Sequence, residues 1–158
     1  MQVASTLDFT KYTPDELCHY LEHKHFEHIK HQFEAALVYF QELHDEHLYI
    51  ETEHLLVLLF KKLKEEVLQL IRRDTLIIFP LISNNENQPS FVSSLQAHKR
   101  IIDILQKIRN LTNNYIQQPE WSKTYKFCCI ELLELEEQIQ EVIYIKENFI
   151  LQKPMLHE

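Results

Sequence analysis

The first residue whose chemistry raises a question is an aspartate in an apolar series. Leu63, Val67 and Leu70 recur at helical spacing, so an apolar residue is expected at the next position of the series. That position is Asp74, in the stretch RRDTLIIFPLI. Burying a carboxylate is costly unless a cation or hydrogen bonds compensate its charge. The sequence must therefore supply a group that compensates Asp74.

Three more residues of the kinds that bind metals stand in comparable apolar series. They are His25, His98 and Glu147. Each lies in line with leucines or isoleucines three or four residues away, as Glu147 does after Ile143. Each of the expected helices thus places one imidazole or carboxylate on its inner face.

These four residues are expected at one level of the fold. In an up-down-up-down bundle, the starts of the first and third helices are level with the ends of the second and fourth. His25 and His98 lie early in their helices, whereas Asp74 and Glu147 lie near the ends of theirs. At about 1.5 Å of rise per residue, the offsets agree to roughly one or two turns. The pattern predicts that imidazoles and carboxylates meet in one layer.

Two interpretations of such a layer are open. Carboxylate oxygens and imidazole nitrogens bind iron, manganese or zinc, and the interiors of helical bundles commonly hold such sites. The charge of the metal would then compensate the buried acids. In the alternative, no metal is present, and His25 and His98 neutralise Asp74 and Glu147 directly.

The elements that must position these residues are helices. The 3.6-residue period is nearly continuous and strand patterns are almost absent. Thr13, Pro14 and Glu16 are typical of a helix start, and Pro80 is expected to end the second helix. The sequence predicts an all-α, up-down-up-down four-helix bundle. Its helices are expected at about residues 13–44, 51–78, 91–115 and 120–152.

The 158 residues fit a single domain. We expect a bundle over residues 13–153, preceded by an arm at 1–12 and followed by a tail at 154–158. The formal net charge of the chain, −8, argues against nucleic acid and anionic membranes as partners. No apolar run approaches about 18 residues, so no membrane span is expected. The absence of glycine leaves no phosphate-binding loop.

The cysteines and the N-terminus bear on the compartment. Cys18, Cys128 and Cys129 are expected to be reduced thiols, buried as small apolar residues. The start MQVASTLDFTKY lacks the basic residues and apolar stretch of a secretory signal. Together these features predict a cytoplasmic protein.

The chain resembles the hemerythrin-like di-iron domain of the iron–sulfur cluster repair (RIC) proteins over about residues 14–152. In that family, histidines and bridging acids on four helices hold two irons. KHFEH supplies His25, LIRRDTLIIFPLI supplies Asp74 before a Phe-Pro pair, SLQAHKRIIDILQKIRNLT supplies His98, and IYIKENFIL supplies Glu147. The resemblance implies a hemerythrin-like bundle with these four residues as metal ligands.

The departures from the family fall on the metal site. Two of the six family ligands, the histidines expected four residues before each acid, are replaced by Leu70 and Ile143. Asp74 is one methylene shorter than the usual glutamate. Four remaining ligands suit one ion, or two with further donors. His28, Glu66 and Tyr144 are candidates for those further donors, the alternative for each being a solvated or interfacial side chain.

The resemblance implies a non-haem iron protein of the nitrosative and oxidative stress response, holding one or two ions, with zinc or manganese as alternative metals. Its partners would be damaged iron–sulfur proteins, and it would bind rather than turn over a substrate. Oxygen carriage is least expected, because ligands are missing. The alternative is a metal-free interaction protein derived from the family. An exposed apolar strip at Trp121, Tyr125 and Phe127 would then support a homodimer.

Overall fold

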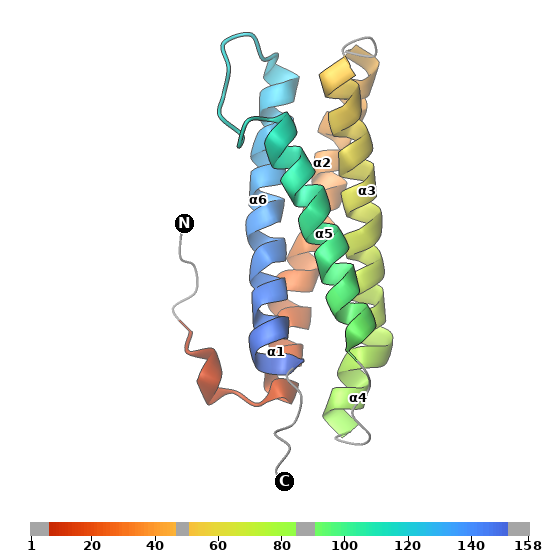
Figure 1. Ribbon diagram of the computed structural model, residues 1–158, viewed down its shortest axis with the longest axis vertical. Coiled ribbons are helices and arrows are strands. Elements are labelled where there is room, and N and C mark those ends of the chain that lie inside the picture. Colours follow the sequence, from red (N-terminus) through yellow and green to blue (C-terminus); the bar gives the residue numbers. More distant parts are fainter. Residues whose placement is uncertain (1–6, 47–50, 85–90, 152–158) are drawn as a thin grey trace.

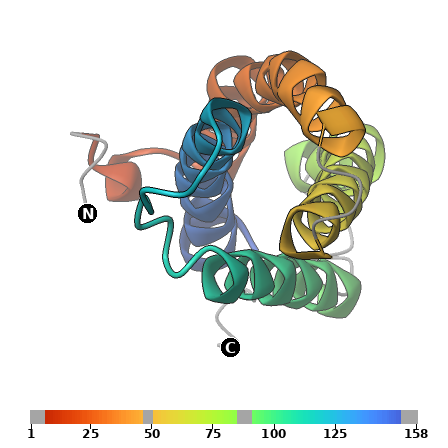
Figure 2. The ribbon, with the colours of Figure 1, turned by 90° about the horizontal axis from the view of Figure 1, so that it is seen from above.

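The computed structural model describes residues 7–46, 51–84 and 91–151. Within these ranges the chain is helical apart from turns and caps, and no strand is formed. Four long helical rods lie side by side (Figure 1), and seen from above they surround a common centre (Figure 2). The prediction of an all-α fold with four helices is confirmed. None of the described helices is long and apolar enough to cross a membrane.

Three of the rods contain a short π-helical segment; these segments are η2, η3 and η4. A 3-10 turn, η1 (Phe9–Lys11), precedes the rods. Rod 1 consists of α1 (Pro14–Tyr20), η2 (Leu21–Phe26) and α2 (Glu27–Glu46). Rod 2 consists of α3 (Glu51–Arg73), η3 (Asp74–Ile78) and α4 (Phe79–Asn84). Rod 3 is α5 (Val92–Leu111), and rod 4 consists of α6 (Lys123–Ile145) and η4 (Lys146–Ile150).

The predicted start of the first helix is confirmed in detail. The hydroxyl of Thr13 accepts from the backbone N–H of Glu16 at 3.1 Å. The carboxylate of Glu16 in turn accepts from the N–H of Thr13 at 2.9 Å. This reciprocal capping satisfies two of the N–H groups that a helix start leaves free. It fixes where rod 1 begins.

The prediction that Pro80 ends the second helix is wrong. Rod 2 passes through Pro80 and ends at Asn84. The preceding turn is π-helical, and the N–H of Phe79 bonds the carbonyl of Asp74, five residues back. A widened turn loosens the regular bonding pattern, so the missing N–H of proline is tolerated there.

The ends of α5 and α6 also differ from the expected ranges. α5 ends at Leu111 because Asn113, Asn114 and Tyr115 adopt left-handed backbone, with φ of 53°, 59° and 63°. That conformation cannot continue a right-handed helix. α6 begins at Lys123 rather than about residue 120, because the hydroxyl of Ser122 accepts from the N–H of Tyr125 and caps the helix there.

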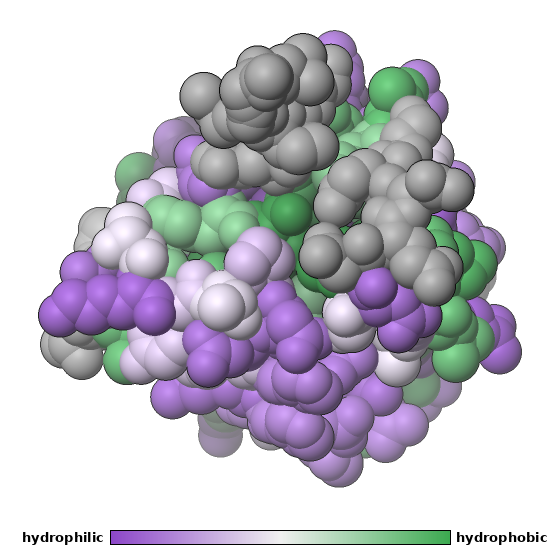
Figure 3. All heavy atoms as spheres, turned by 90° about the horizontal axis from the view of Figure 1, so that it is seen from below, coloured by the Kyte–Doolittle hydropathy of each residue, from purple (hydrophilic) through white to green (hydrophobic). Residues whose placement is uncertain are grey.

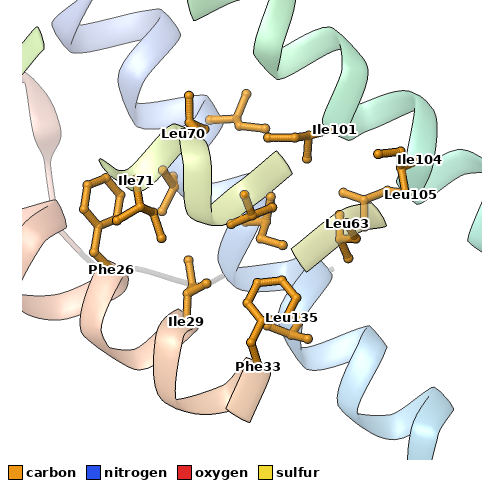
Figure 4. Packing of buried hydrophobic residues seen from close by; sticks show 14 of the residues in the cluster. Phe26, Ile29, Phe33, Leu63, Leu70, Ile71, Ile101, Ile104, Leu105 and Leu135 are labelled. Carbon is orange, nitrogen blue, oxygen red and sulfur yellow. The ribbon is translucent and has the colours of Figure 1, made fainter. Parts of the chain in front are cut away.

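The core is built from inward-facing side chains of all four rods, among them Phe33, Leu63, Ile101 and Leu135 (Figure 4). Phe40 stacks on Phe60 with ring centroids 3.9 Å apart. The three cysteines are buried free thiols, as expected. Seen from below, hydrophilic side chains cover one half of the molecule's end, while apolar surface shows in patches in the other half (Figure 3).

The start of rod 1 lies at the same end of the molecule as the ends of rods 2 and 4. α1 contacts both α4 and η4, and Figure 1 shows α1 and α4 near the lower end. The three π-helical segments contain or begin with His25, Asp74 and Lys146. π-helical turns widen a helix locally and often occur where side chains must be redirected for function. This end of the bundle therefore holds the candidate site.

Candidate functional site

The group that compensates Asp74 is a lysine. Asp74 is fully buried, and its Oδ2 lies 2.5 Å from Nζ of Lys146, which is fully buried as well. Asp74 is the first residue of η3, and Lys146 is the first residue of η4. The contact thus joins rod 2 to rod 4 inside the bundle. Sequence reasoning missed Lys146 altogether.

A spacing signal for Lys146 exists in the sequence. The inner stripe of a helix advances by three or four residues at a time. In rod 4 the buried side chains Ile139, Ile143, Lys146 and Ile150 follow one another by four, three and four residues. Glu147, four residues after Ile143, was expected on the inner face, but its side chain is 40% exposed. A lysine can occupy such a position because its long stem is hydrocarbon.

The electrostatics of the pair are those of two charges removed from water. Burial raises the pKa of Asp74 and lowers the pKa of Lys146, and in each case the partner's charge opposes the shift. Within the described part of the chain, neither the oxygens of Asp74 nor Nζ of Lys146 have a partner in hydrogen-bond geometry, so the ion pair is the contact that compensates both groups. Each group therefore depends on the other for its compensation.

His98 lies beside this pair and is held from outside by Glu147. Its Nδ1 lies 2.8 Å from Oε2 of Glu147. Burial, together with the positive charge of Lys146, lowers the pKa of His98 to about 3. The ring is therefore neutral at pH 7, and we assign its proton to Nδ1, where the carboxylate accepts it. Its Nε2 is buried and lacks a hydrogen-bond partner among the described residues.

His25 contacts other residues of rod 4 than Asp74 and His98 do. Its Nδ1 is 2.8 Å from Oε1 of Gln138, and its Nε2 is 3.5 Å from Oε2 of Glu141. Gln138 and Glu141 precede Lys146 by eight and five residues in rod 4. The contacts of His25 are therefore separate from those of the lysine–aspartate pair.

Two residues of rod 1 act electrostatically on the pair: Glu22, whose charge contributes to the raised pKa of Asp74, and Cys18. The side chain of Cys18 is buried, and its thiol pKa is raised to about 12, first by burial and further by nearby carboxylates that include Asp74. The charge of Lys146 acts in the opposite direction. We define the buried polar layer as Cys18, Asp74, His98 and Lys146, one residue from each rod.

Two of the positions expected to supply further metal donors, His28 and Tyr144, are exposed. Glu66 is only 13% exposed, and its carboxylate accepts from the guanidinium of Arg100 at 3.2 Å. The structure therefore engages Glu66 in a pair between rods, rather than with the buried polar layer.

A second buried acid was not anticipated from the sequence. The carboxylate of Glu136 accepts from Arg109 at 2.6 Å, from the hydroxyl of Tyr115 at 2.9 Å and from Gln140 at 3.2 Å. These bonds tie rod 4 to the left-handed turn that follows α5. Because Glu136 has three donors, its burial is compensated without a metal or a ligand, and we assign it a structural role.

These contacts decide how well a metal fits the layer. Within residues 7–46, 51–84 and 91–151, no group of three or more histidine, cysteine or acidic side chains is arranged to hold an ion. Oδ2 of Asp74 contacts an ammonium group, and the carboxylate of Glu147 contacts His98. A metal beside Asp74 would meet the positive charge of Lys146. The arrangement as it stands does not fit the family's iron pair.

Comparison with known proteins adds no assignment. No known family model matches the chain, and no curated protein matches it in sequence.

Proposed function

We propose that this protein is a member of the hemerythrin-like, up-down-up-down bundles whose core holds no metal, and that it acts in the cytoplasm as an interaction module rather than as an iron carrier. The observation that carries the proposal is the contact between Lys146 and Asp74, 2.5 Å long and fully buried. The acid that would bridge metal ions is retained, and the cation beside it is supplied covalently by the chain.

The surroundings of the pair support this proposal. Leu70 and Ile143 stand where the family has histidines, and both are buried in the hydrophobic core. The space of the lost imidazoles is therefore filled by hydrocarbon. An ammonium group compensates a buried carboxylate when the two are in direct contact. The layer is stabilised without an exogenous ion, so we propose that its role is to hold four rods together.

A role in binding is supported by the outer surface. Val92, Leu95 and Ile102 are exposed along α5 at spacings of three and seven residues. The strip expected near the start of α6 is not formed as such. Tyr125 is buried, Trp121 packs on it at 4.7 Å, and Phe127 is the exposed residue of the three. We propose the exposed face of α5 as the partner-binding surface.

Elemental analysis tests the absence of a metal. Protein purified from cells grown with iron is expected to hold less than about a tenth of an equivalent of iron, because Lys146 repels a cation at Asp74. The Lys146→Met variant keeps the aliphatic bulk and removes the charge, so it tests whether that charge is what excludes a cation from Asp74. Lys107→Met, at an exposed position of α5, is the matched control. Stoichiometric iron in the wild-type protein would contradict the proposal.

A second candidate function is favoured by one observation. The Nδ1 atoms of His25 and His98 are held by side-chain oxygens, and their Nε2 atoms are buried without a hydrogen-bond partner among the described residues. Metal-binding histidines are oriented in this way. The candidate is the iron-binding repair protein that the resemblance implies, with Lys146 moved aside. Its signature is iron that is lost in both His98→Gln and Asp74→Asn.

A further inference from the structure

Two histidines on the exposed side of rod 1 are arranged as a pair. His19 lies in α1 and His23 lies in η2, one helical turn later. Their rings are parallel to within 9°, and the ring centroids are 6.3 Å apart. Imidazoles four residues apart on one helical face have the spacing that helical zinc sites use. Neither residue belongs to the buried polar layer.

Acidic side chains flank His19. Oδ1 of Asp15 lies 3.8 Å from Nε2 of His19, and Oε1 of Glu22 lies 3.9 Å from its Nδ1. These distances are too long for hydrogen bonds but short enough for electrostatic attraction. Two carboxylates beside His19 favour a cation at this ring.

The pair also faces accessible space. His19 and His23 line the same surface groove, which has a volume of about 480 Å³. Its other lining residues include Tyr12, Leu17 and Tyr20. An ion held by the two rings would keep coordination positions open toward this groove, where water or a small ligand can fill them.

We propose that His19 and His23 form a bidentate site for a divalent transition-metal ion, with zinc as the reference ion and copper(II) and nickel as further members of the class. Imidazole nitrogen suits these metals, whereas magnesium and calcium prefer oxygen ligands. The site lies on the surface and is separate from the core, so it goes beyond the proposed function. Metal binding by this protein is then a property of α1 and η2.

The test is a calorimetric titration of the metal-stripped full-length protein with zinc alone, near neutral pH. We expect one equivalent to bind to the wild-type protein. His19→Ala and His23→Ala should each weaken binding at least about tenfold, because one imidazole cannot chelate. The matched control is His31→Ala, which removes an exposed histidine farther along rod 1, in α2. It should bind as the wild type does.

Two outcomes overturn the proposal: unchanged affinity in His23→Ala, or an equal loss in His31→Ala. A second measurement needs no variant, because nickel added to wild-type protein should broaden the ring-proton NMR signals of His19 and His23 first. Broadening at His25 and His98 instead would refute the surface site. If Asp74→Asn also lost metal binding, the metal-free core would be refuted as well. Failure of the surface site and failure of the proposed function are therefore distinguishable.

Discussion

Lys146 and Glu147 are neighbours in the chain, but their side chains contact two different rods, one from the buried interior and the other from the surface. Lys146 is fully buried and contacts Asp74 of rod 2. Glu147 is 40% exposed and bonds His98 of rod 3 from the rim. Consecutive residues of a helix point in clearly different directions, so one turn of η4 serves both contacts. The end of rod 4 thereby fixes the positions of rods 2 and 3.

The first prediction concerns the stability of the lysine–aspartate pair. Lys146→Met should lower the free energy of unfolding by about 3–5 kcal/mol, because it leaves the carboxylate of Asp74 buried without its cation. Urea denaturation at neutral pH measures the effect. Lys107→Met, at an exposed position of α5, should change stability by less than about 0.5 kcal/mol.

The double variant sharpens this prediction. Asp74→Leu combined with Lys146→Met removes both charges and replaces them with hydrocarbon of similar size. Such replacements are often neutral or stabilising, and Oδ1 of Asp74 already lacks a hydrogen-bond partner among the described residues. The double variant should therefore recover most of the stability lost in Lys146→Met. If the loss in the double variant equals the sum of the losses in Asp74→Leu and Lys146→Met, the two residues are not energetically coupled, and our account of the layer is wrong.

The second prediction concerns acid sensitivity. Burial, with the charge of Lys146, lowers the pKa of His98 from 6.5 to about 3. As the pH falls below about 6.5, the unfolded chain takes up a proton at this position and the folded protein does not. The contribution of His98 to stability is therefore complete above that pH. It is lost progressively as the pH falls toward about 3, by at most about 1.4 kcal/mol per pH unit.

His98→Gln should remove this dependence. The stability of the variant, measured by urea denaturation between about pH 7 and pH 4, should fall less steeply than that of the wild type. His31→Gln, at an exposed position, should leave the slope unchanged. Parallel slopes for all three proteins would mean that His98 is protonated in the folded state.

The fold was more predictable from the sequence than the site. Helical periodicity and the capping residues Thr13 and Glu16 are local signals, and they located the four rods, with ends that differ from the structure by up to six residues, as at Asn84. Asp74 was identified as a buried acid by the same periodicity. Its partner Lys146 was missed because the inner stripe of a helix can advance by either three or four residues. After Ile143, both Lys146 and Glu147 fit that spacing, and Glu147 was preferred because carboxylates bind metals.

The levels of the side chains along the bundle were less predictable. His25 was expected level with Asp74, but it contacts Gln138 and Glu141, whereas Asp74 contacts Lys146. The estimate from helix ends allowed an error of one to two turns. That margin is too coarse to say which residues of rod 4 each side chain contacts. Periodicity gives the face of a residue well and its height poorly, and a metal site depends on both.

The third prediction concerns Glu136. Glu136→Ala should destabilise the protein by about 1–3 kcal/mol, because it leaves the hydroxyl of Tyr115 and the guanidinium of Arg109 without their acceptor. Glu137→Ala removes an exposed carboxylate from the next position of the same helix. That control should have little effect on unfolding. Equal effects would show that the Glu136 contacts do not stabilise the turn after α5.

The last prediction concerns the thiols. Cys18, Cys128 and Cys129 are buried, and the pKa of Cys18 and of Cys129 is raised to about 12, chiefly by burial. The thiolate is the reactive form, so folded protein should react slowly with a disulfide reagent such as Ellman's reagent at mildly alkaline pH. All three thiols should react rapidly in denaturant.

Lys146→Met should hasten the reaction of Cys18 in particular, because it loosens the buried polar layer and raises the population of open states. Mass spectrometry of the labelled sites measures this, with Cys129 as the internal reference. The global destabilisation of Lys146→Met accelerates both positions, so the local connection is measured by the additional acceleration at Cys18. Equal acceleration at both positions would show that Cys18 opens only with the whole protein.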